Sequence, residues 1–357
     1  MNRLIKISLV FLLLGTFLLT SCNYRQNQTQ PDIWEKLDLA TNTPIRNMYA
    51  SPVELYLLSD DEFVRINNQN ELLERRVFPD LPTTFYGRPS ISQYAFTYLV
   101  WQDDVQYSME VHLTKNPDEI FYFNLKDLEA VNDSFTVDLE TSARYNGAFN
   151  EDNTQFLLPV MDKGSNKYSV FLFDINLTFN KQSFINTTST KGVEVSKKID
   201  LPLAAIKGDL MNTSYINGFY YITSKWGTYR IDPNTGDYTQ VNQIWTLDAF
   251  GHQGKIYLTG FNDFDFYVSN DNGLSFEQVG VSPLKYVEVE NNQIISQTQL
   301  GLPWHLAEDD MLSNEAIRVN NSFVDDGASY WNIRHFYGRY YLSIQKEVYF
   351  LEDLEVE

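Results

Sequence analysis

The 357-residue sequence contains a single cysteine, Cys22, so the chain cannot form an intramolecular disulfide. Basic residues are also few: 27 Lys and Arg stand against 47 Asp and Glu, which gives a formal net charge of −20. So acidic a protein is unsuited to binding nucleic-acid phosphates or anionic lipid head groups through its surface. We therefore expect no nucleic-acid partner, and expect cations, neutral glycans, peptides or basic protein surfaces instead.

Sequence patterns that mark metal, nucleotide and hydrolase sites are also missing. There is no HExxH, no Cys/His cluster, no phosphate-binding glycine loop and no GxSxG segment. We therefore expect no metal ion and no cofactor, and assign no catalytic residue. A glycosidase needs two carboxylates that face each other about 5–10 Å apart, which neighbours in sequence do not establish. The acidic pairs open to such a role are Asp103–Asp104, Asp263 with Asp265, Asp309–Asp310 and Asp325–Asp326.

The first 21 residues have the organisation of a secretory signal peptide. Arg3 and Lys6 make a basic start, and the apolar run from Ile7 to Leu19 is too short for a stable membrane span. The segment ends in Leu19-Thr20-Ser21-Cys22, which resembles the lipobox of bacterial lipoproteins. The resemblance implies cleavage before Cys22 and attachment of several acyl chains, which anchor a protein stably. Cleavage removes two basic residues and no acidic one, so the net charge becomes −22. We expect the mature protein in the bacterial cell envelope, lipid-anchored on the periplasmic side of a membrane or at the outer membrane.

Beyond a polar, flexible tether that ends at residue 31, the sequence has almost no sustained helical periodicity. Short apolar or alternating runs rich in Tyr, Phe, Ile and Val are separated by Asn, Asp and Gly clusters, which is typical of strands and turns. The clearest unit, residues 244–281, has four such runs: IWTLDAF, GKIYLTG, DFDFYVS and SFEQVGV. Repeated four-strand units of about 40–50 residues favour a β-propeller over a β-sandwich.

Counting the first run of each unit predicts about seven blades. These runs begin near Ile45, Ser90, Arg144, Ala205, Ile244, Leu284 and Ala328. Six or eight blades stay open, because residues 85–140 divide into strands in more than one way. The last unit has only three runs, and residues 33–40 precede the first unit without a blade of their own. We therefore predict a signal peptide (1–21), a lipidated tether (22–31) and one all-β propeller (32–357), in which 33–40 completes the last blade and removes its open edge.

One turn in this pattern carries a recognisable motif. Ser269, Asp271, Gly273 and Phe276 stand in the sequence SNDNGLSF, which resembles the Asp-box of sialidases and related propeller proteins. Asp271 is expected to accept hydrogen bonds from amides of its own turn, Gly273 to adopt a positive φ, and Phe276 to pack under the turn. The resemblance implies a structural role on the face opposite the active site, so we do not predict catalysis by Asp271.

Successive turns of a four-stranded antiparallel blade alternate between two faces. The connections from the second to the third strand, and from the fourth strand to the next blade, share one face, which we call the loop face. Loops 77–90, 224–227, 261–265, 298–310 and 321–327 are assigned to it. Exposed aromatic side chains beside polar groups suit sugar or peptide recognition. The candidate ligand-binding residues are Tyr86, Arg88, Trp226, Asp263, Trp304, His305, Asp325 and Asp326.

Among these, Trp304 is the leading candidate, because a large amphipathic ring in a long polar loop costs solubility unless it binds or packs. The sequence thus predicts a non-enzymatic, membrane-anchored scaffold that binds an envelope protein or a glycan through the loop face. The alternative is a carbohydrate-active enzyme, a glycoside hydrolase or lyase, on the same face. A central pocket with converging acids would favour the enzyme, and a flat patch or plugged channel the scaffold.

Overall fold

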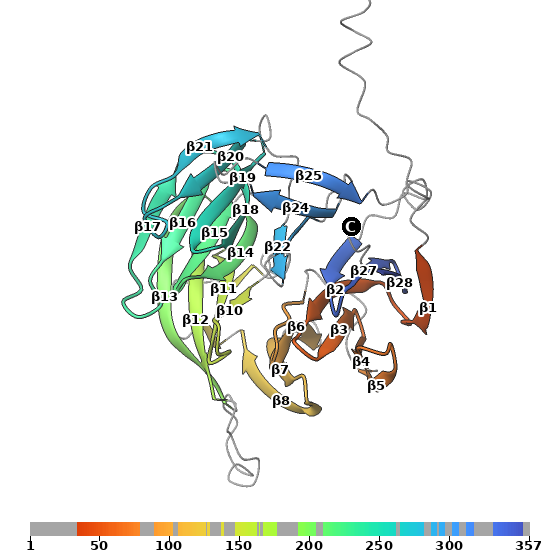
Figure 1. Ribbon diagram of the computed structural model, residues 1–357. Coiled ribbons are helices and arrows are strands. Elements are labelled where there is room, and N and C mark those ends of the chain that lie inside the picture. The colour runs from red at the N-terminus through yellow and green to blue at the C-terminus, as the bar shows by residue number, and fades with distance from the viewer. Residues whose placement is uncertain are drawn as a thin grey trace, which may run out of the picture. The chain divides into compact units, whose positions relative to one another are not determined.

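The described residues of the computed structural model form seven antiparallel sheets that follow one another along the chain (Figure 1). Contacts separate Met1–Ile33 from a second unit, Trp34–Glu357, to which all of these sheets belong. The structure describes residues 34–78, 89–102, 106–125, 127–128, 137–138, 147–162, 164, 167–176, 192–204, 210–261, 265–281, 287–290, 293–296, 302–306, 312–317 and 331–352.

The strands of the first three sheets are β2 (Ile45–Ala50), β3 (Glu54–Ser59), β4 (Glu62–Asn67) and β5 (Leu72–Val77); β6 (Ala95–Gln102), β7 (Gln106–Leu113) and β8 (Asn116–Asn124); and β9 (Val137–Asp138), β10 (Ala148–Phe149), β11 (Gln155–Asp162), β12 (Lys167–Ile175) and β13 (Val193–Ala204). Both β9 and β10 pair with β11, at residues 161–162 and 156–157 respectively. Two short strands therefore share the place of one innermost strand in the third sheet.

The remaining sheets comprise β14 (Leu210–Ile216), β15 (Phe219–Ser224), β16 (Gly227–Ile231) and β17 (Tyr238–Asn242); β18 (Thr246–His252), β19 (Lys255–Gly260), β20 (Asp265–Ser269) and β21 (Glu277–Val281); β22 (Val287–Glu290), β23 (Gln293–Ser296), β24 (Leu302–Leu306) and β25 (Leu312–Ile317); and β26 (Trp331–His335), β27 (Arg339–Ile344) and β28 (Glu347–Glu352) with β1 (Glu35–Ala40). The fold is an all-β propeller of seven blades, as the sequence predicts.

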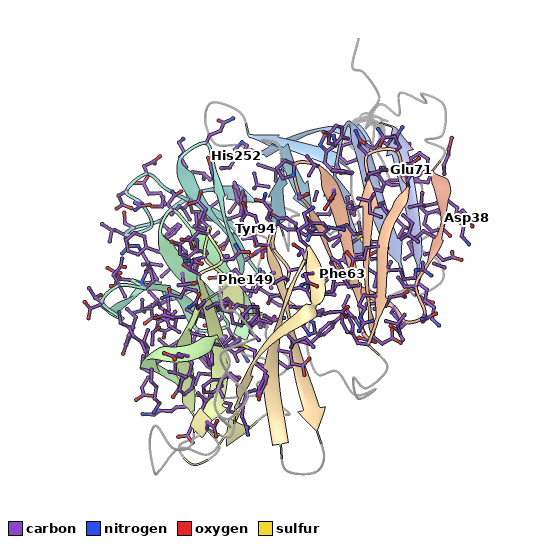
Figure 2. The ribbon with its side chains drawn as sticks, turned by 90° about the horizontal axis from the view of Figure 1, so that it is seen from below. Asp38, Phe63, Glu71, Tyr94, Phe149 and His252 are labelled. Atoms are coloured by element: carbon purple, nitrogen blue, oxygen red, sulfur yellow. The ribbon has the colours of Figure 1, made fainter. Side chains whose placement is uncertain are left out.

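Burial explains why strands within one blade differ in sequence. The second strands β3, β15 and β19 are buried at every position but the first, because each packs against sheets on both sides. They are accordingly continuous apolar or aromatic runs rather than alternating ones. The outer strands β5 and β17 are mostly exposed. Figure 2 shows Phe63 in the interior, where it is fully buried, and Asp38 at the periphery on β1.

The first strand of the domain completes the last blade, which confirms the predicted closure. β1 pairs antiparallel with β28, with Glu35 opposite Phe350 and Lys36 opposite Tyr349 (Figure 1). The inward side chains Leu37 and Leu39 pack in one cluster with residues of β2–β4 and of β27 and β28. The closing strand therefore joins the last blade by its backbone and contacts the first blade by its side chains.

The innermost strand of the second blade is a very short segment. Strands β6, β7 and β8 form a three-stranded sheet, and residues 90–91 pair with β6: Ile91 forms a bridge with Phe96, and the Thr97 amide donates to the Ser90 carbonyl. Asn47 of β2 donates to the Pro89 carbonyl (2.9 Å), and the Ser90 hydroxyl donates to the Gly147 carbonyl next to β10 (2.6 Å). Residues 89–92 therefore lie between the innermost strands of the first and third blades, where the sequence count places the second.

A polar residue recurs at one position of three innermost strands. In β2, β14 and β18 the pairing register shifts after the first residue, and Asn47, Asn212 and Asp248 follow the shift. Asp248 is buried and accepts hydrogen bonds from the Asn212 side chain and from the Val287 amide, both at 2.7 Å. One carboxylate thus links three consecutive blades.

Residues 298–310 are only partly a loop, which corrects the prediction for this segment. Residues 302–306 form β24, whose Trp304 is paired with Ile294 of β23 and Asn314 of β25. β24 is the third strand of the sixth blade. The rest of the segment, residues 298–301 and 307–310, lies outside the described residues.

Candidate functional site

An aromatic cluster with one lysine lies on the loop face between the fourth and fifth blades. Lys225 and Trp226 form the turn between β15 and β16, Trp245 precedes β18, and Phe261 follows β19. The Trp245 and Phe261 rings stack nearly parallel, with centroids 3.8 Å apart and planes 13° apart. The Lys225 Nζ lies 5.7 Å from the Trp226 ring centroid and 5.4 Å from that of Trp245. We call these four residues the aromatic–lysine cluster.

The turn that carries Trp226 is held in one conformation. The Ser224 hydroxyl accepts from the Trp226 amide at 3.1 Å and donates to the Gly227 carbonyl at 2.7 Å. The Gln240 side chain donates to the Trp226 carbonyl at 2.8 Å. Gly227 has φ +122°, and a Cβ there would lie 2.2 Å from the Asn242 carbonyl oxygen. The Trp226 backbone is thus fixed before any ligand arrives, which lowers the entropy cost of binding.

The aromatic–lysine cluster is exposed in part and anchored in part. Trp226 and Phe261 are 48% and 44% exposed, whereas Trp245 is half-buried. Lys225 is exposed, and no described carboxylate lies within ion-pair distance of it. Several other cationic side chains of the described residues form ion pairs with carboxylates, as Arg46 does with Asp60. The Lys225 ammonium instead has the faces of two indoles as its neighbours.

The structure locates the other predicted ligand-binding residues unevenly. Trp226 is described in full, and its turn lies beside the connection that carries Phe261, as the alternation of turns predicts. Trp304 and His305 lie on β24 rather than in a loop, and their side chains are outside the described part of the structure. The candidates outside the described residues are Tyr86, Arg88, Asp263, Asp325 and Asp326, together with Cys22.

Asp271 accepts hydrogen bonds from its own turn, as predicted from the sequence. Its Oδ1 accepts from the amides of Leu274 (3.1 Å) and Ser275 (2.9 Å), and its Oδ2 accepts from the Ser275 hydroxyl (2.6 Å). These bonds from Ser275, with one from Ser269, hold the pKa of Asp271 well below its usual range. The carboxylate is therefore occupied within the turn.

The same turn is docked onto the preceding blade. Gly273 has φ +79°, and a Cβ there would lie 2.1 Å from the hydroxyl of Tyr221 on β15. The Tyr221 hydroxyl donates to the Asn272 carbonyl at 3.3 Å. Phe276 packs in the cluster that contains Tyr221 and Ile256. The contacts give this turn, on the face opposite the loop face, a structural role.

Two buried carboxylates are engaged in structural bonds. Besides its two links to neighbouring blades, Asp248 accepts from the Ala249 amide at 2.8 Å. Glu62, which has no exposed surface, accepts from the Asn42 amide at 3.0 Å and pairs with Arg75 at 3.2 Å. Of the acidic pair Asp263 and Asp265, only Asp265 lies within the described residues, and its carboxylate also accepts hydrogen bonds from the protein.

Asp265 begins β20 next to the cluster residue Phe261. Its carboxylate accepts from the Tyr267 hydroxyl at 3.0 Å and from the Gln278 side chain at 2.6 Å. Burial, with the hydrogen bond to Asp265, raises the pKa of Tyr267 to about 12. Tyr267 is therefore a neutral donor at physiological pH. Among the described side chains, no three His, Cys, Asp or Glu residues come together to hold a metal ion.

Two members of the aromatic–lysine cluster are absent from the sequence-based candidates. Trp245 and Phe261 flank strands β18 and β19 directly, so each reads as part of an apolar strand run and hence as core. The alternation of turns between the two faces would have identified both residues. Trp245 lies in the connection from the fourth blade to the fifth, and Phe261 lies in the connection from the second to the third strand of the fifth blade. Both connections belong to the loop face.

Comparisons with known proteins identify the fold but no family. No protein-family model and no curated protein matches the chain. Within the described ranges, no helix has the length and apolar character needed to cross a membrane.

Comparison with solved structures finds matches that cover most of this chain. The WD40 domain of Pan2 from Neurospora crassa aligns with a TM-score of 0.56 and 10% identity, over 92% of this chain and 98% of that domain. The WD40 domain of SCAP from fission yeast aligns with a TM-score of 0.40 and 10% identity, over 91% and 99%. The extracellular domain of the hybrid two-component system BT4673 from B. thetaiotaomicron gives 0.47 and 10%, over 89% of this chain and 40% of that one. At 10% identity the likeness to the Pan2 domain shows the fold alone, which is a β-propeller.

Proposed function

We propose that the protein is a lipid-anchored β-propeller of the bacterial cell envelope that binds a protein or glycan partner through its loop face. The observation that carries the proposal is the aromatic–lysine cluster. In this strongly acidic protein the exposed Trp226 stands beside the exposed Lys225, and the exposed Phe261 of the next blade stacks on Trp245, which the same lysine contacts. Exposed aromatic groups in a fixed, partly polar setting are the usual anchors of recognition sites.

The proposed lipid anchor would keep the protein in the envelope, among its proposed partners. Residues Leu19-Thr20-Ser21-Cys22 would direct acylation of Cys22, and the polar segment up to residue 31 would separate the lipid from β1. The net charge of −22 that remains after cleavage would repel anionic head groups. Attachment would therefore come from the lipid, and the loop face would stay available to a partner.

The engaged carboxylates support binding over the alternative of a carbohydrate-active enzyme. Asp248, Glu62 and Asp265 each accept two or three hydrogen bonds or ion pairs from the protein itself. A general acid or nucleophile needs a carboxyl group directed at substrate instead. The bonds that these three carboxylates make within the protein therefore suit a structural role in a binding scaffold better than a catalytic role.

Capture from detergent-solubilised envelopes tests the proposal. The full-length tagged protein would be cross-linked in cells and purified, alongside Trp226→Ala and Phe261→Ala. Each variant should bind the partner about tenfold more weakly than the parent, a loss of about 1.4 kcal/mol of binding free energy. Both side chains are about half exposed, so the melting temperature should stay close to that of the parent.

Tyr337→Asn supplies a matched control. Tyr337 is 52% exposed and lies in the turn between β26 and β27, on the face opposite the loop face. It adopts φ +51°, which asparagine accommodates well. This variant should capture partner as the parent does. Equal capture by all four proteins would contradict recognition through the loop face.

A further inference from the structure

We propose that the aromatic–lysine cluster binds a saccharide that carries a carboxylate, as in an oligosaccharide that contains uronic acid. The inference rests on the proposed function, because it names the chemical class of ligand for the loop face. Three properties of the cluster support it: the disposition of its rings, the charge it presents and the area it exposes.

The rings offer stacking surfaces that are already fixed. Trp245 covers one side of Phe261 in the parallel stack, and Phe261 is still 44% exposed, so the solvent reaches its other side. Trp226 is 48% exposed on a turn that three hydrogen bonds hold in place. Flat apolar faces of this kind suit the C–H face of a pyranose ring, while the sugar hydroxyls stay in water.

The lysine determines the charge of the ligand. Indole faces attract cations, but Lys225 already supplies that cation, with its Nζ 5.7 Å and 5.4 Å from the two indole centroids. A cationic ligand would therefore meet repulsion. A carboxylate would instead find an ammonium group that no described acid neutralises, and could form a charge-assisted hydrogen bond with it.

The overall charge and the small area narrow the ligand further. The net charge of −22 that remains after cleavage repels long polyanions at long range, so a short acidic oligosaccharide with few charges suits the site better. Large aromatic side chains present about 150–250 Å² each, so the exposed parts of Trp226 and Phe261 together offer about 200 Å². A stable protein interface takes about 800 Å² from each partner. The cluster therefore fits one or two sugar rings better than a protein surface.

Calorimetric titration of the full-length protein in detergent tests the ligand class. The probes are α-1,4-linked trigalacturonate and the neutral trisaccharide made from it by carboxyl reduction. Trigalacturonate should bind with a Kd of about 1 mM or tighter. The neutral probe should bind at least about fivefold more weakly. The difference should shrink as salt is added, because the carboxylate–ammonium attraction is screened.

Variants separate the two contributions. Lys225→Gln should reduce the affinity for trigalacturonate to that for the neutral probe, while Trp226→Ala should weaken both by about tenfold. Tyr337→Asn should change neither. The ligand class is wrong if trigalacturonate does not bind at about 10 mM, if both probes bind the parent equally, or if Lys225→Gln has no effect.

The two proposals can fail separately. If trigalacturonate does not bind but Trp226→Ala still abolishes capture of an envelope protein, the inference of an acidic saccharide fails and partner binding through the loop face stands. If Trp226→Ala changes neither sugar binding nor capture, both fail.

Discussion

Replacing Asp248 by alanine should destabilise the propeller more than any surface substitution in the same blade. Asp248 is 2% exposed, and its carboxylate accepts from Asn212 (2.7 Å), Ala249 (2.8 Å) and Val287 (2.7 Å). Alanine would leave two backbone amides and one side-chain amide without their acceptor. Each unsatisfied buried donor costs about 1–3 kcal/mol, and the half-buried Asn212 can find water, so the two backbone amides predict a loss of about 2–6 kcal/mol.

A double-mutant cycle isolates the contact between blades. Asn212→Ala alone removes one donor and should cost about 1–2 kcal/mol. Once Asp248 is alanine, the same change should cost almost nothing, because the bond it breaks is already gone. The free energy of unfolding would be measured by urea denaturation followed by tryptophan fluorescence. The pair would then show a coupling energy of about 1 kcal/mol or more.

Glu277 provides the matched control for this experiment. It is an exposed carboxylate on β21, the outer strand of the blade to which Asp248 belongs. Glu277→Ala should change the free energy of unfolding by less than about 0.5 kcal/mol. The reasoning is refuted if Asp248→Ala is no more destabilising than Glu277→Ala, or if the Asn212 and Asp248 effects are additive.

Four further predictions concern closure, the Asp271 turn, the anchor and Trp304. Deleting residues 33–40 removes β1 with its buried leucines, each worth about 1.5–3 kcal/mol, and exposes the β28 edge; the melting temperature should fall sharply, and an unchanged value would contradict closure. Hydrogen bonds from Ser275 hold the folded-state pKa of Asp271 below 3.8, so their stabilisation is present above that pH and is lost as the pH falls through the lowered pKa; Asp271→Asn should be less stable than the parent at neutral pH, and the gap should narrow below pH 3.8 in pH-dependent urea denaturation, whereas a constant gap would contradict the assignment. Cys22→Ala should shift the protein from membranes to soluble or uncleaved fractions, and mass spectrometry that finds mature Cys22 unmodified would end the lipoprotein hypothesis. Trp304 lies on β24 between β23 and β25 rather than in a loop, so Trp304→Ala separates binding from packing: weaker ligand capture at an unchanged melting temperature would support the sequence prediction, and a loss of several kcal/mol would identify Trp304 as core.

The sequence predicts the propeller well because the strands with the strongest signal lie in the middle of each blade. Strands such as β15 and β19 are buried on both sides, so each contains an unbroken run of apolar or aromatic residues, FYYI and IYL respectively. Short turns separate them from their neighbours, and the four-strand rhythm follows. The closure by β1 was predictable because the last unit lacks one strand.

Sequence reasoning missed β24 as a strand, because it contains Pro303 and follows a glycine and so reads as a loop. The first strand of the second blade was predicted to begin near Ser90. The bonds of Asn47 and Ser90 to neighbouring segments now show its place between the first and third blades. Trp245 and Phe261 were missed for the opposite reason, since they adjoin apolar strands and look like core.

Site-specific photo-cross-linking in living cells tests the central claim most directly. A photoactivatable amino acid would replace Trp226 on the loop face or, in a second strain, Tyr337 on the opposite face; both native side chains are about half exposed. The account predicts a discrete cross-linked adduct of protein or glycan from position 226 and none from position 337. Adducts of equal yield from both positions, or from neither, would contradict recognition through the loop face.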